Sequence, residues 1–273
     1  MNAIQLALNQ ARRVEQSYPW GQVVWHVWSH GKNLKPLVLF HGGSGSWTHW
    51  VRNVNTLAQT HEVWVLDTPG FGDSELPPQT RDADDLVPFV AEVLQKTFEN
   101  EPVAVLGFSF GGMLAGLVAA QHPHLFSCMV LIGVPGLGLF GEELPMRGMM
   151  AGMSEAQQRD VHRHNLKTIM LRDETLITDA LIDLQQANVA RDRLRRRRIA
   201  RTDILAQIQH AWTCPVYGIW GEQDALYKDR LHHIPQVLKV LRSFTLVPEA
   251  GHWVMYEKPE AFHTIVNALL RQN

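Results

Sequence analysis

Residues 103–120 read V-A-V-L-G-F-S-F-G-G-M-L-A-G-L-V-A-A, and this stretch decides the fold. Its first part is short and rich in β-branched residues, as a buried strand is. Its second part holds small and apolar residues, as a buried helix does. The uncharged run also reaches the length of a membrane-spanning helix. Its four glycines and Ser109 favour instead a strand that turns sharply into a helix.

Apolar runs on both sides of this stretch predict the rest of a sheet. Continuous runs such as P-L-V-L-F are typical of strands that are buried on both faces. Strands that alternate with helices predict a parallel sheet covered on both faces, which is an α/β fold. We expect strands at 23–29, 36–41, 61–67, 102–108, 126–133, 214–220 and 243–248, and helices at 84–99, 110–122, 228–239 and 258–271.

The composition limits the classes of protein that need to be considered. A chain of 273 residues with 45% hydrophobic and 19% charged residues fits one large α/β domain with an insertion, or two small domains. A net charge of −2 gives no field that would attract nucleic acid or a membrane surface. Cys128 and Cys214 lie far apart, and the N-terminus lacks the pattern of a secretory signal. We therefore expect a cytoplasmic protein that acts on a small molecule, without nucleic acid, membrane, cofactor or metal; a homodimer stays open.

One segment interrupts the alternation of strands and helices. Residues 141–210 contain no Phe, Trp or Tyr, hold five of the nine Met, and show no strand pattern. We expect a helical lid inserted at 138–206, with the core formed by 1–137 and 207–273.

Ser109 is the candidate nucleophile. Gly107-Phe108-Ser109-Phe110-Gly111 fits the pattern G-x-S-x-G between a strand and a helix. The turn is so tight that its flanking positions must be small, and it leaves the serine Oγ free at the N-terminus of the helix. There the unpaired N–H groups and the helix dipole favour developing negative charge. A tight turn that merely contains a serine is the alternative.

A nucleophilic serine needs a base, and the base needs an orienting carboxylate. His252 follows the strand S-F-T-L-V-P, and Asp224 follows the strand C-P-V-Y-G-I-W. Both lie at carboxyl ends of strands, where open α/β sheets place their sites. The chain order Ser, Asp, His is the one expected on this fold. Glu222 is the rival acid.

A loop rich in glycine could supply an oxyanion hole. His41-Gly42-Gly43-Ser44-Gly45-Ser46 follows the strand P-L-V-L-F directly. Glycines let the backbone approach a substrate closely. We assign the two oxyanion donors to the N–H groups of Gly43 and Phe110.

These motifs together resemble the α/β-hydrolase family over nearly the whole chain. H-G-G-S-G-S, D-T-P-G-F-G-D-S (67–74), G-F-S-F-G-G, G-E-Q-D and G-H-W-V-M-Y-E-K-P-E-A-F are similar to its landmarks, in its order. The resemblance implies an eight-stranded, mostly parallel sheet with a helical cap. It also implies a structural role for Asp67 and Asp73.

Within that family the chain is most similar to meta-cleavage product hydrolases and carboxylesterases. The phrase R-D-E-T-L-I-T (172–178) and Trp253 after the histidine resemble the hydrolases that split carbon–carbon bonds. Phe108 stands where they usually carry Asn. Gln185 stands where they carry an arginine for the substrate carboxylate, and the nearest arginine is Arg191. We favour hydrolysis of a carboxylic ester, with carbon–carbon cleavage as the alternative and a non-catalytic binding protein as the rival of another class.

The aromatic and methionine side chains expected above the G-x-S-x-G turn, called the elbow below, predict an apolar substrate. As substrate contacts we expect Gly42, Trp47, Phe108, Phe140, Met149, Met150, Arg191 and Trp253.

Other patterns carry weaker hypotheses. We expect the seven arginines of 191–201 to lie on a solvated helix of the lid. We expect Met149, Met150 and Met153 to lie on a further lid helix, where they pack in the core or line the active site. We expect surface positions for the histidines at 162, 164, 232 and 233.

Overall fold

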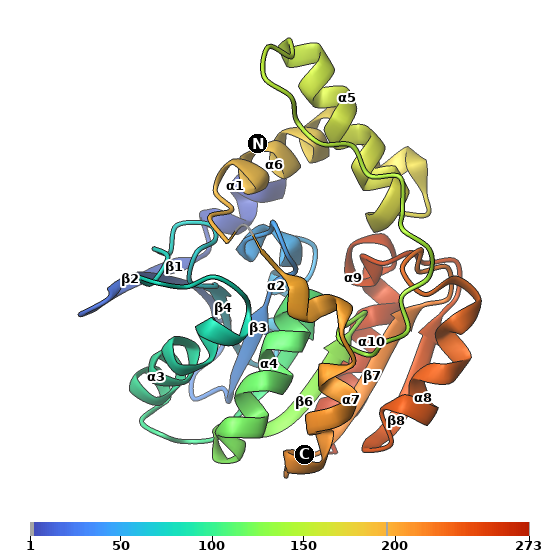
Figure 1. Ribbon diagram of the computed structural model, residues 1–273. Coiled ribbons are helices and arrows are strands. Elements are labelled where there is room, and N and C mark those ends of the chain that lie inside the picture. The colour runs from blue at the N-terminus through green and yellow to red at the C-terminus, as the bar shows by residue number, and fades with distance from the viewer. Residues whose placement is uncertain (1–2, 195, 273) are drawn as a thin grey trace.

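A single sheet of eight strands forms the centre of the computed structural model, which describes residues 3–194 and 196–272 (Figure 1). The strands lie in the order β1-β2-β4-β3-β5-β6-β7-β8. Strand β2 runs antiparallel to both of its neighbours, β1 and β4, and all other neighbouring strands are parallel. The predicted α/β architecture with an eight-stranded, mostly parallel sheet is confirmed.

Seven of the strands lie where the apolar runs predicted them. The bounds are β1 Arg12–Tyr18, β2 Gly21–Trp28, β3 Pro36–Phe40, β4 Glu62–Asp67, β5 Val103–Phe108, β6 Phe126–Ile132, β7 Val216–Gly221 and β8 Leu241–Val247. The strand that the runs did not predict is β1. Its sequence R-R-V-E-Q-S-Y is polar because it lies at the edge of the sheet, where charged side chains prevent pairing with other chains.

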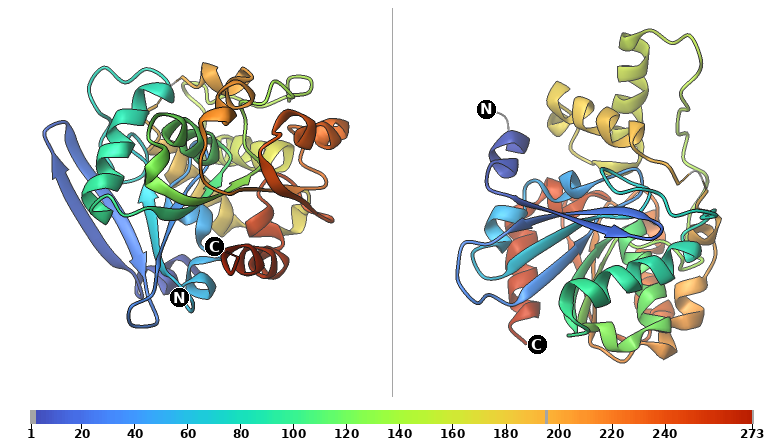
Figure 2. Two further views of the ribbon diagram at one scale, coloured as in Figure 1. Left: turned by 90° about the horizontal axis from the view of Figure 1, so that it is seen from below. Right: turned by 90° about the vertical axis from the view of Figure 1, so that its left-hand side faces the viewer.

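Helices flank the sheet and connect its strands (Figure 2). The α-helices are α1 Ala3–Leu8, α2 Val54–Leu57, α3 Val87–Phe98, α4 Phe110–Gln121, α5 Glu155–Asn165, α6 Asp179–Ala190, α7 Ile204–Ile208, α8 Ile234–Val237, α9 Val254–Glu257 and α10 Pro259–Leu270. Shorter turns of helix are η1 Trp47–Trp50, η2 Asp84–Leu86, η3 Pro123–Leu125, η4 Leu166–Met170, η5 Glu174–Leu176, η6 Arg198–Arg201, η7 Gln209–Ala211 and η8 Lys228–His233.

The two faces of the sheet carry separate hydrophobic clusters. In β3, Val38 and Phe40 belong to the cluster under α3 and α4, whereas Leu37 and Leu39 belong to the cluster under α2 and α10. This alternation follows from the period of two residues in a strand. The inner parallel strands β3, β5, β6 and β7 are therefore buried from both sides, which explains why their sequences are largely apolar.

The stretch 103–120 divides as its sequence predicts. It forms β5 and then α4, with Ser109 between them. In the two described ranges, no helix combines the length and the apolar character that crossing a bilayer requires.

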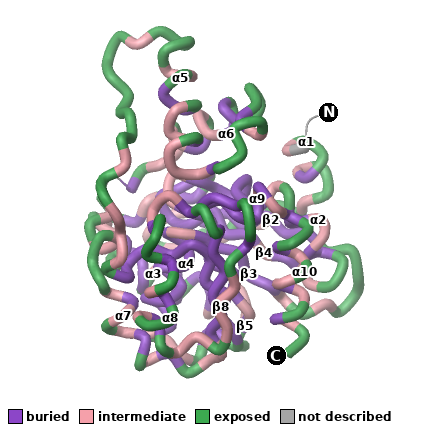
Figure 3. The backbone as a smooth tube through the Cα atoms, turned by 90° about the vertical axis from the view of Figure 1, so that its right-hand side faces the viewer, coloured by how far each residue is buried: buried purple, intermediate pink, exposed green. Residues whose placement is uncertain are grey.

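Residues 138–206, called the inserted segment below, leave the sheet after β6 and return before β7. They form α5, α6 and α7 with short turns, and α5 and α6 stand above one end of the sheet (Figure 1). Its outer part is largely exposed (Figure 3). Two expectations about it were wrong. Met149, Met150 and Met153 lie in an irregular stretch before α5, and of the described residues in the arginine-rich run only Arg198–Arg201 are helical.

Candidate active site

Ser109 lies at the turn between β5 and α4 in a conformation that non-glycine residues rarely adopt. Its φ is 50° and its ψ is −119°. Its N–H donates to the Ile132 carbonyl of β6 at 2.7 Å, which ties the turn to the next strand. Backbone strain of this kind persists only where surrounding structure imposes it, and it is common at active sites.

The glycines of the motif leave no room for side chains. A Cβ atom on Gly107 would overlap the backbone of Gly112, and one on Gly111 would overlap the carbonyl of His41. The strand, the turn and the start of the helix therefore pack backbone against backbone. This close packing is the physical reason for glycine at both positions.

The side chain of Ser109 contacts the predicted base and, through it, the predicted acid. The Ser109 Oγ lies 2.9 Å from His252 Nε2, and His252 Nδ1 lies 2.8 Å from Asp224 Oδ2. His252 and Asp224 are buried. Because a carboxylate only accepts hydrogen bonds, the Nδ1–H of neutral His252 donates to Asp224 and leaves Nε2 free to accept the Ser109 proton. Glu222, the rival acid, is exposed.

The loops that carry the base and the acid are fixed by hydrogen bonds that are buried or partly buried. The second oxygen of Asp224 accepts the Leu226 N–H at 3.0 Å. The Glu257 carboxylate accepts the Gly251 N–H beside His252 and, at 2.7 Å each, the N–H groups of Arg172 and Asp173 in the inserted segment. Burial raises the pKa of Glu257, and these N–H donors oppose the shift.

The predicted oxyanion donors lie side by side. A Cβ atom on Gly43 would lie 3.6 Å from Phe110 Cβ. Within residues 3–194 and 196–272, neither the Gly43 nor the Phe110 N–H donates to a protein acceptor. Phe110 is the first residue of α4, so its N–H is one of the free donors at a helix N-terminus.

Two buried histidines hold the peptide before Gly43. His41 Nδ1 lies 2.8 Å from the Gly42 carbonyl oxygen, and the Gly42 N–H donates to His49 Nδ1 at 3.1 Å. Burial lowers the pKa of His41 and of His49, so both rings stay neutral. The Gly42 carbonyl and the Gly43 N–H share one planar trans peptide, and they point in opposite directions. By holding the carbonyl, His41 therefore sets the direction of the Gly43 N–H.

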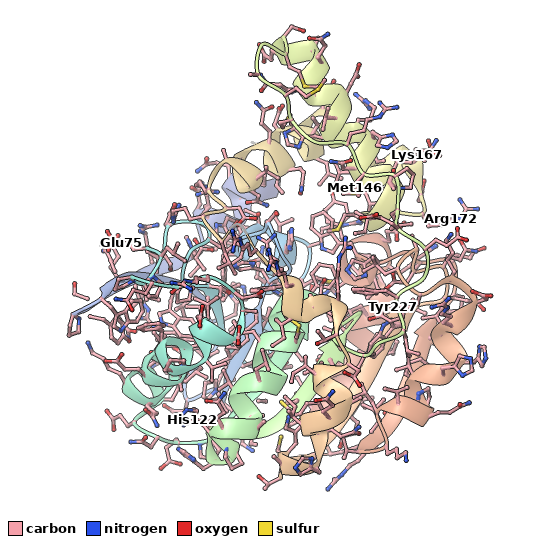
Figure 4. The ribbon with its side chains drawn as sticks, in the orientation of Figure 1. Glu75, His122, Met146, Lys167, Arg172 and Tyr227 are labelled. Atoms are coloured by element: carbon pink, nitrogen blue, oxygen red, sulfur yellow. The ribbon has the colours of Figure 1, made fainter. Side chains whose placement is uncertain are left out.

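A cavity of about 460 Å³ opens over Ser109 and His252. Gly43 and Phe110 also line it, as do parts of α5, α6 and the stretch before α5. Figure 4 shows Met146 beneath the helices of the inserted segment. The wall is largely apolar: its apolar residues include Phe140, Met146, Met149, Val161, Leu166, Ile169, Met170, Val189 and Leu226.

Of the predicted substrate contacts, Phe140 and Met149 line this cavity and the others do not. Gly42 is buried between the two histidines. Phe108 is fully buried, and its ring lies 5.1 Å from that of His252, so it supports the base from behind. Phe108 and Gly42 are therefore corrected from substrate contacts to packing positions.

The remaining four predicted contacts are also corrected. Trp47 packs on His26, with ring centroids 5.3 Å apart, and Trp253 is fully buried and donates to the His49 carbonyl at 3.0 Å. Met150 is 70% exposed. Arg191 pairs with Asp73 at 2.8 Å, away from Ser109. The sequence positions of these residues did not show where their side chains point.

Several cavity residues were missed. His162 is buried in the cavity wall and not on the surface as expected; burial lowers its pKa. Gln185 on α6 and Arg197 also line the cavity, and both Gln185 Oε1 and Arg197 Nε are buried without a hydrogen bond in the described chain. The family resemblance already places Gln185 where relatives bind a substrate carboxylate, so this signal could have added it to the expected contacts. No sequence signal separates Arg197 from the arginines around it.

One further group of side chains has the composition of a metal site. His26, Asp67 and Asp73 bring a ligand atom each to within 4.8 Å of one another. The oxygens of Asp67 already accept the N–H groups of Trp47 at 2.8 Å and of Asp73 at 3.0 Å, and Asp73 pairs with Arg13 and Arg191. These bonds fit the structural role that the motif implied for both aspartates.

Comparison with known proteins identifies the family of the chain. A family model described as "Alpha/beta hydrolase family" matches residues 37–265. The dihydrolipoyllysine-residue acetyltransferase component of the acetoin cleaving system of Pseudomonas putida is 28% identical over 89% of this chain, which spans 65% of that protein. A 2-hydroxy-6-oxononadienedioate/2-hydroxy-6-oxononatrienedioate hydrolase of Paraburkholderia phymatum is 26% identical over 90% of this chain and 91% of its own length.

A solved structure shares the fold. Carboxylesterase CesB of Bacillus subtilis superposes with a TM-score of 0.80, covering 99% of this chain and 96% of its own, at 17% identity. The chain therefore belongs to the alpha/beta hydrolase family.

Proposed function

We propose that the protein is a serine hydrolase that cleaves a small, largely apolar carboxylic ester. The observation that carries the proposal is the relay from Ser109 Oγ through His252 to Asp224, with contacts of 2.9 and 2.8 Å, below two free N–H groups. A serine placed this way is activated by the histidine, and the carboxylate orients and stabilises the imidazolium that forms.

The reaction would proceed in two halves. His252 Nε2 takes the Ser109 proton while Oγ bonds to the ester carbonyl carbon, and the oxyanion that forms accepts the N–H groups of Gly43 and Phe110. The alcohol leaves with the proton from His252, which produces an acyl-enzyme. Water, deprotonated by His252, then releases the acid and restores Ser109. Each oxyanion donor is typically worth about 3–4 kcal/mol in the transition state.

The cavity supports a small apolar substrate. Its volume of about 460 Å³ lies in the range of small-molecule sites. Three methionines in its wall, Met146, Met149 and Met170, can adapt to different acyl or alcohol groups because the side chain is flexible.

A specific observation favours carbon–carbon cleavage of a ring-fission dienoate as the second candidate. Arg197 lines the cavity, and its Nε lies 3.5 Å from the position of a Cβ on Gly43. Arg147 and Arg201 also line the cavity, but Arg197 is the arginine beside Gly43, where a substrate carboxylate close to the reacting carbon would lie; Arg191 does not line the cavity. Asp192 pairs with Arg197 and offsets part of its charge, which is why the ester ranks first.

The test combines covalent labelling with a substrate panel. A fluorophosphonate is expected to modify Ser109 of the folded protein, as seen by mass spectrometry, and p-nitrophenyl esters are expected to be hydrolysed faster than a dienoate ring-fission product. Ser109→Ala is expected to lose the adduct and at least about 10⁴-fold of kcat.

Each alternative has its own outcome in this test. Faster turnover of the dienoate would favour the carbon–carbon reaction. Absence of an adduct on folded wild-type protein would favour a non-catalytic binding protein and contradict the proposal.

A further inference from the structure

The loop that carries Gly43 is bound from the inserted segment at two places. Ser44 Oγ donates to Asp192 Oδ2 at 2.6 Å. Two residues further, Ser46 Oγ donates to Asn188 Oδ1 at 2.8 Å. Asn188 and Asp192 are four residues apart, at the end of α6 and just beyond it, so one side of this element faces the loop.

Asn188 is buried, and both halves of its amide are bonded. Besides accepting from Ser46, it donates through Nδ2 to Thr48 Oγ1 at 2.9 Å. Ser46 is also the N-cap of η1, since its Oγ accepts the Thr48 N–H at 3.3 Å. A buried polar group that lost one of these partners would be left unsatisfied, which disfavours any other placement of α6 against the loop.

Asp192 holds the residue next to Gly43. Its side chain is 10% exposed, and besides Ser44 it binds the Arg197 guanidinium and the Leu194 N–H at 3.1 Å. Ser44 has a φ of 50°, a left-handed conformation that a serine keeps only when its surroundings hold it there. The hydrogen bond to Asp192 is a direct restraint on this residue.

These bonds complete the support of the oxyanion loop. His41 and His49 fix Gly42 from the core side, and Asp192 fixes Ser44 from the side of the inserted segment. Gly43 lies between the two fixed residues. Its N–H is therefore directed by contacts from both parts of the chain.

The same helix also faces the cavity. Gln185 and Val189 of α6 line the cavity above Ser109, while Asn188 binds the loop. A substrate that fills the cavity therefore contacts the helix that holds the oxyanion loop. Contacts far from the scissile bond can be used in this way to position catalytic groups.

We infer that Asn188 and Asp192 are positioning residues that direct the Gly43 N–H toward the oxyanion. The inference rests on the proposed serine hydrolysis. Neither residue lines the cavity, so both act through the loop and not by contact with the substrate.

The experiment measures ester hydrolysis by Asn188→Ala, with Gln186→Ala as the control. Gln186 lies on the same helix, and its side chain has no hydrogen bond in the described chain. Asn188→Ala is expected to lower kcat about 10- to 100-fold, which is less than the 10²–10³-fold typical for loss of a whole oxyanion donor, with KM within about twofold. Gln186→Ala is expected to keep both constants.

A second readout isolates the oxyanion. A trifluoromethyl ketone that carries the acyl group of the best ester forms a bond from its carbonyl carbon to Ser109 Oγ. His252 takes the Ser109 proton, and the product is a hemiketal oxyanion. Its inhibition constant is expected to rise by the same factor as kcat falls in Asn188→Ala, whereas the affinity for the product acid stays constant. A general loss of structure would weaken both ligands.

If Asn188→Ala does not fold, Asp192→Asn tests the same inference. It keeps the size of the side chain and removes its charge, and we expect a two- to fivefold loss in kcat and in ketone affinity, as charge assistance roughly doubles a hydrogen bond. An increase in KM alone, or lower stability with unchanged kcat, would overturn the inference. A wild-type protein that neither hydrolyses esters nor reacts with fluorophosphonate would overturn the proposed function itself, and the inference with it.

Discussion

His49 shows how a residue outside the cavity shapes the site. Its ring packs against Trp253, with centroids 4.8 Å apart, and against Phe108, and its Nδ1 accepts the Gly42 N–H. The His41 ring centroid lies 6.1 Å from that of His49, and a positive charge on His41 or His252 would disfavour a second one on His49. A proton on Nδ1 would remove the acceptor and place a cation in a buried site.

We expect His49 to make folding sensitive to acid. Burial holds its folded pKa well below the ordinary 6.5, so between these values the unfolded chain binds more protons. Its contribution to stability is complete above pH 6.5 and falls as the pH decreases, by at most about 1.4 kcal/mol per pH unit. The free energy of unfolding, measured with urea at several pH values between 7 and 5, is expected to fall less steeply with decreasing pH for His49→Asn than for wild type. This pH dependence is called the slope below.

An exposed histidine provides the control for this prediction. His124→Asn changes a histidine in η3 at the surface, and we expect it to keep the wild-type slope. His41 titrates in the same direction as His49, so some slope remains in the variant. Equal slopes for wild type and His49→Asn would contradict the prediction.

The serine, the histidine and the aspartate that contact one another were predictable from the sequence, whereas most residues that line the cavity above them were not. Ser109, Asp224 and His252 follow strand ends, so the sheet itself brings them together. The lining depends on where the inserted segment lies, which no local pattern encodes. Arg191 was therefore wrongly expected to contact the substrate, and Arg197, six residues further along the chain, was missed as a residue of the cavity wall.

The junction of β5 and α4 depends on glycine more than on any polar contact. A Cβ on Gly111 would overlap the backbone of His41 at the end of β3, so the helix and the strand must separate. Backbone atoms cannot move as a flexible side chain would. We expect Gly111→Ala to lower the free energy of unfolding by at least about 1–3 kcal/mol and to reduce kcat, because the turn also sets Ser109.

Gly148→Ala is the matched control for this substitution. No atom lies within 4 Å of a Cβ at Gly148, and its φ lies outside the left-handed region. Urea denaturation and ester hydrolysis are expected to be unchanged in this variant. Wild-type stability in Gly111→Ala would mean that the junction is less tightly packed than described.

Strands that are buried on both faces were predictable from the sequence, whereas the edge strand of the sheet and the exposed stretch before α5 were not. β3, β5, β6 and β7 are buried on both faces, so their composition alone identifies them. Strand β1 was missed because its pairing with β2 and not its own hydrophobicity holds it in place. The stretch 142–153 was expected to be helical around its methionines, but it has few backbone partners.

At the scale of the whole molecule, stability is unevenly distributed. The sheet lies between two hydrophobic clusters, whereas residues 142–153 are mostly exposed (Figure 3). Asn165 binds both backbone groups of Arg147 at 2.8 Å, and this anchors one point of the stretch. Local opening should therefore require far less free energy there than in the sheet.

Hydrogen exchange followed by mass spectrometry tests this difference. Amides of 142–153 are expected to exchange within about a minute at pH 7, whereas those of β5 are expected to remain protected for hours, as in other cooperative cores. The helix α4 serves as a second protected reference. Protection of 142–153 equal to that of β5 would contradict the prediction.

The two ends of the inserted segment meet. The Gly136 N–H donates to the Ala200 carbonyl, and the Gly138 N–H to that of Thr202, both at 3.0 Å, so the chain that leaves the sheet lies beside the chain that returns. What lies between forms a loop closed at its base, which can be lengthened, shortened or exchanged with little effect on the strands. Recombination between distant relatives could thus replace this segment as a unit. Selection for new substrates can act on it while the sheet keeps Ser109, Asp224 and His252 in place, as long as the contacts from Asn188 and Asp192 to the oxyanion loop are kept.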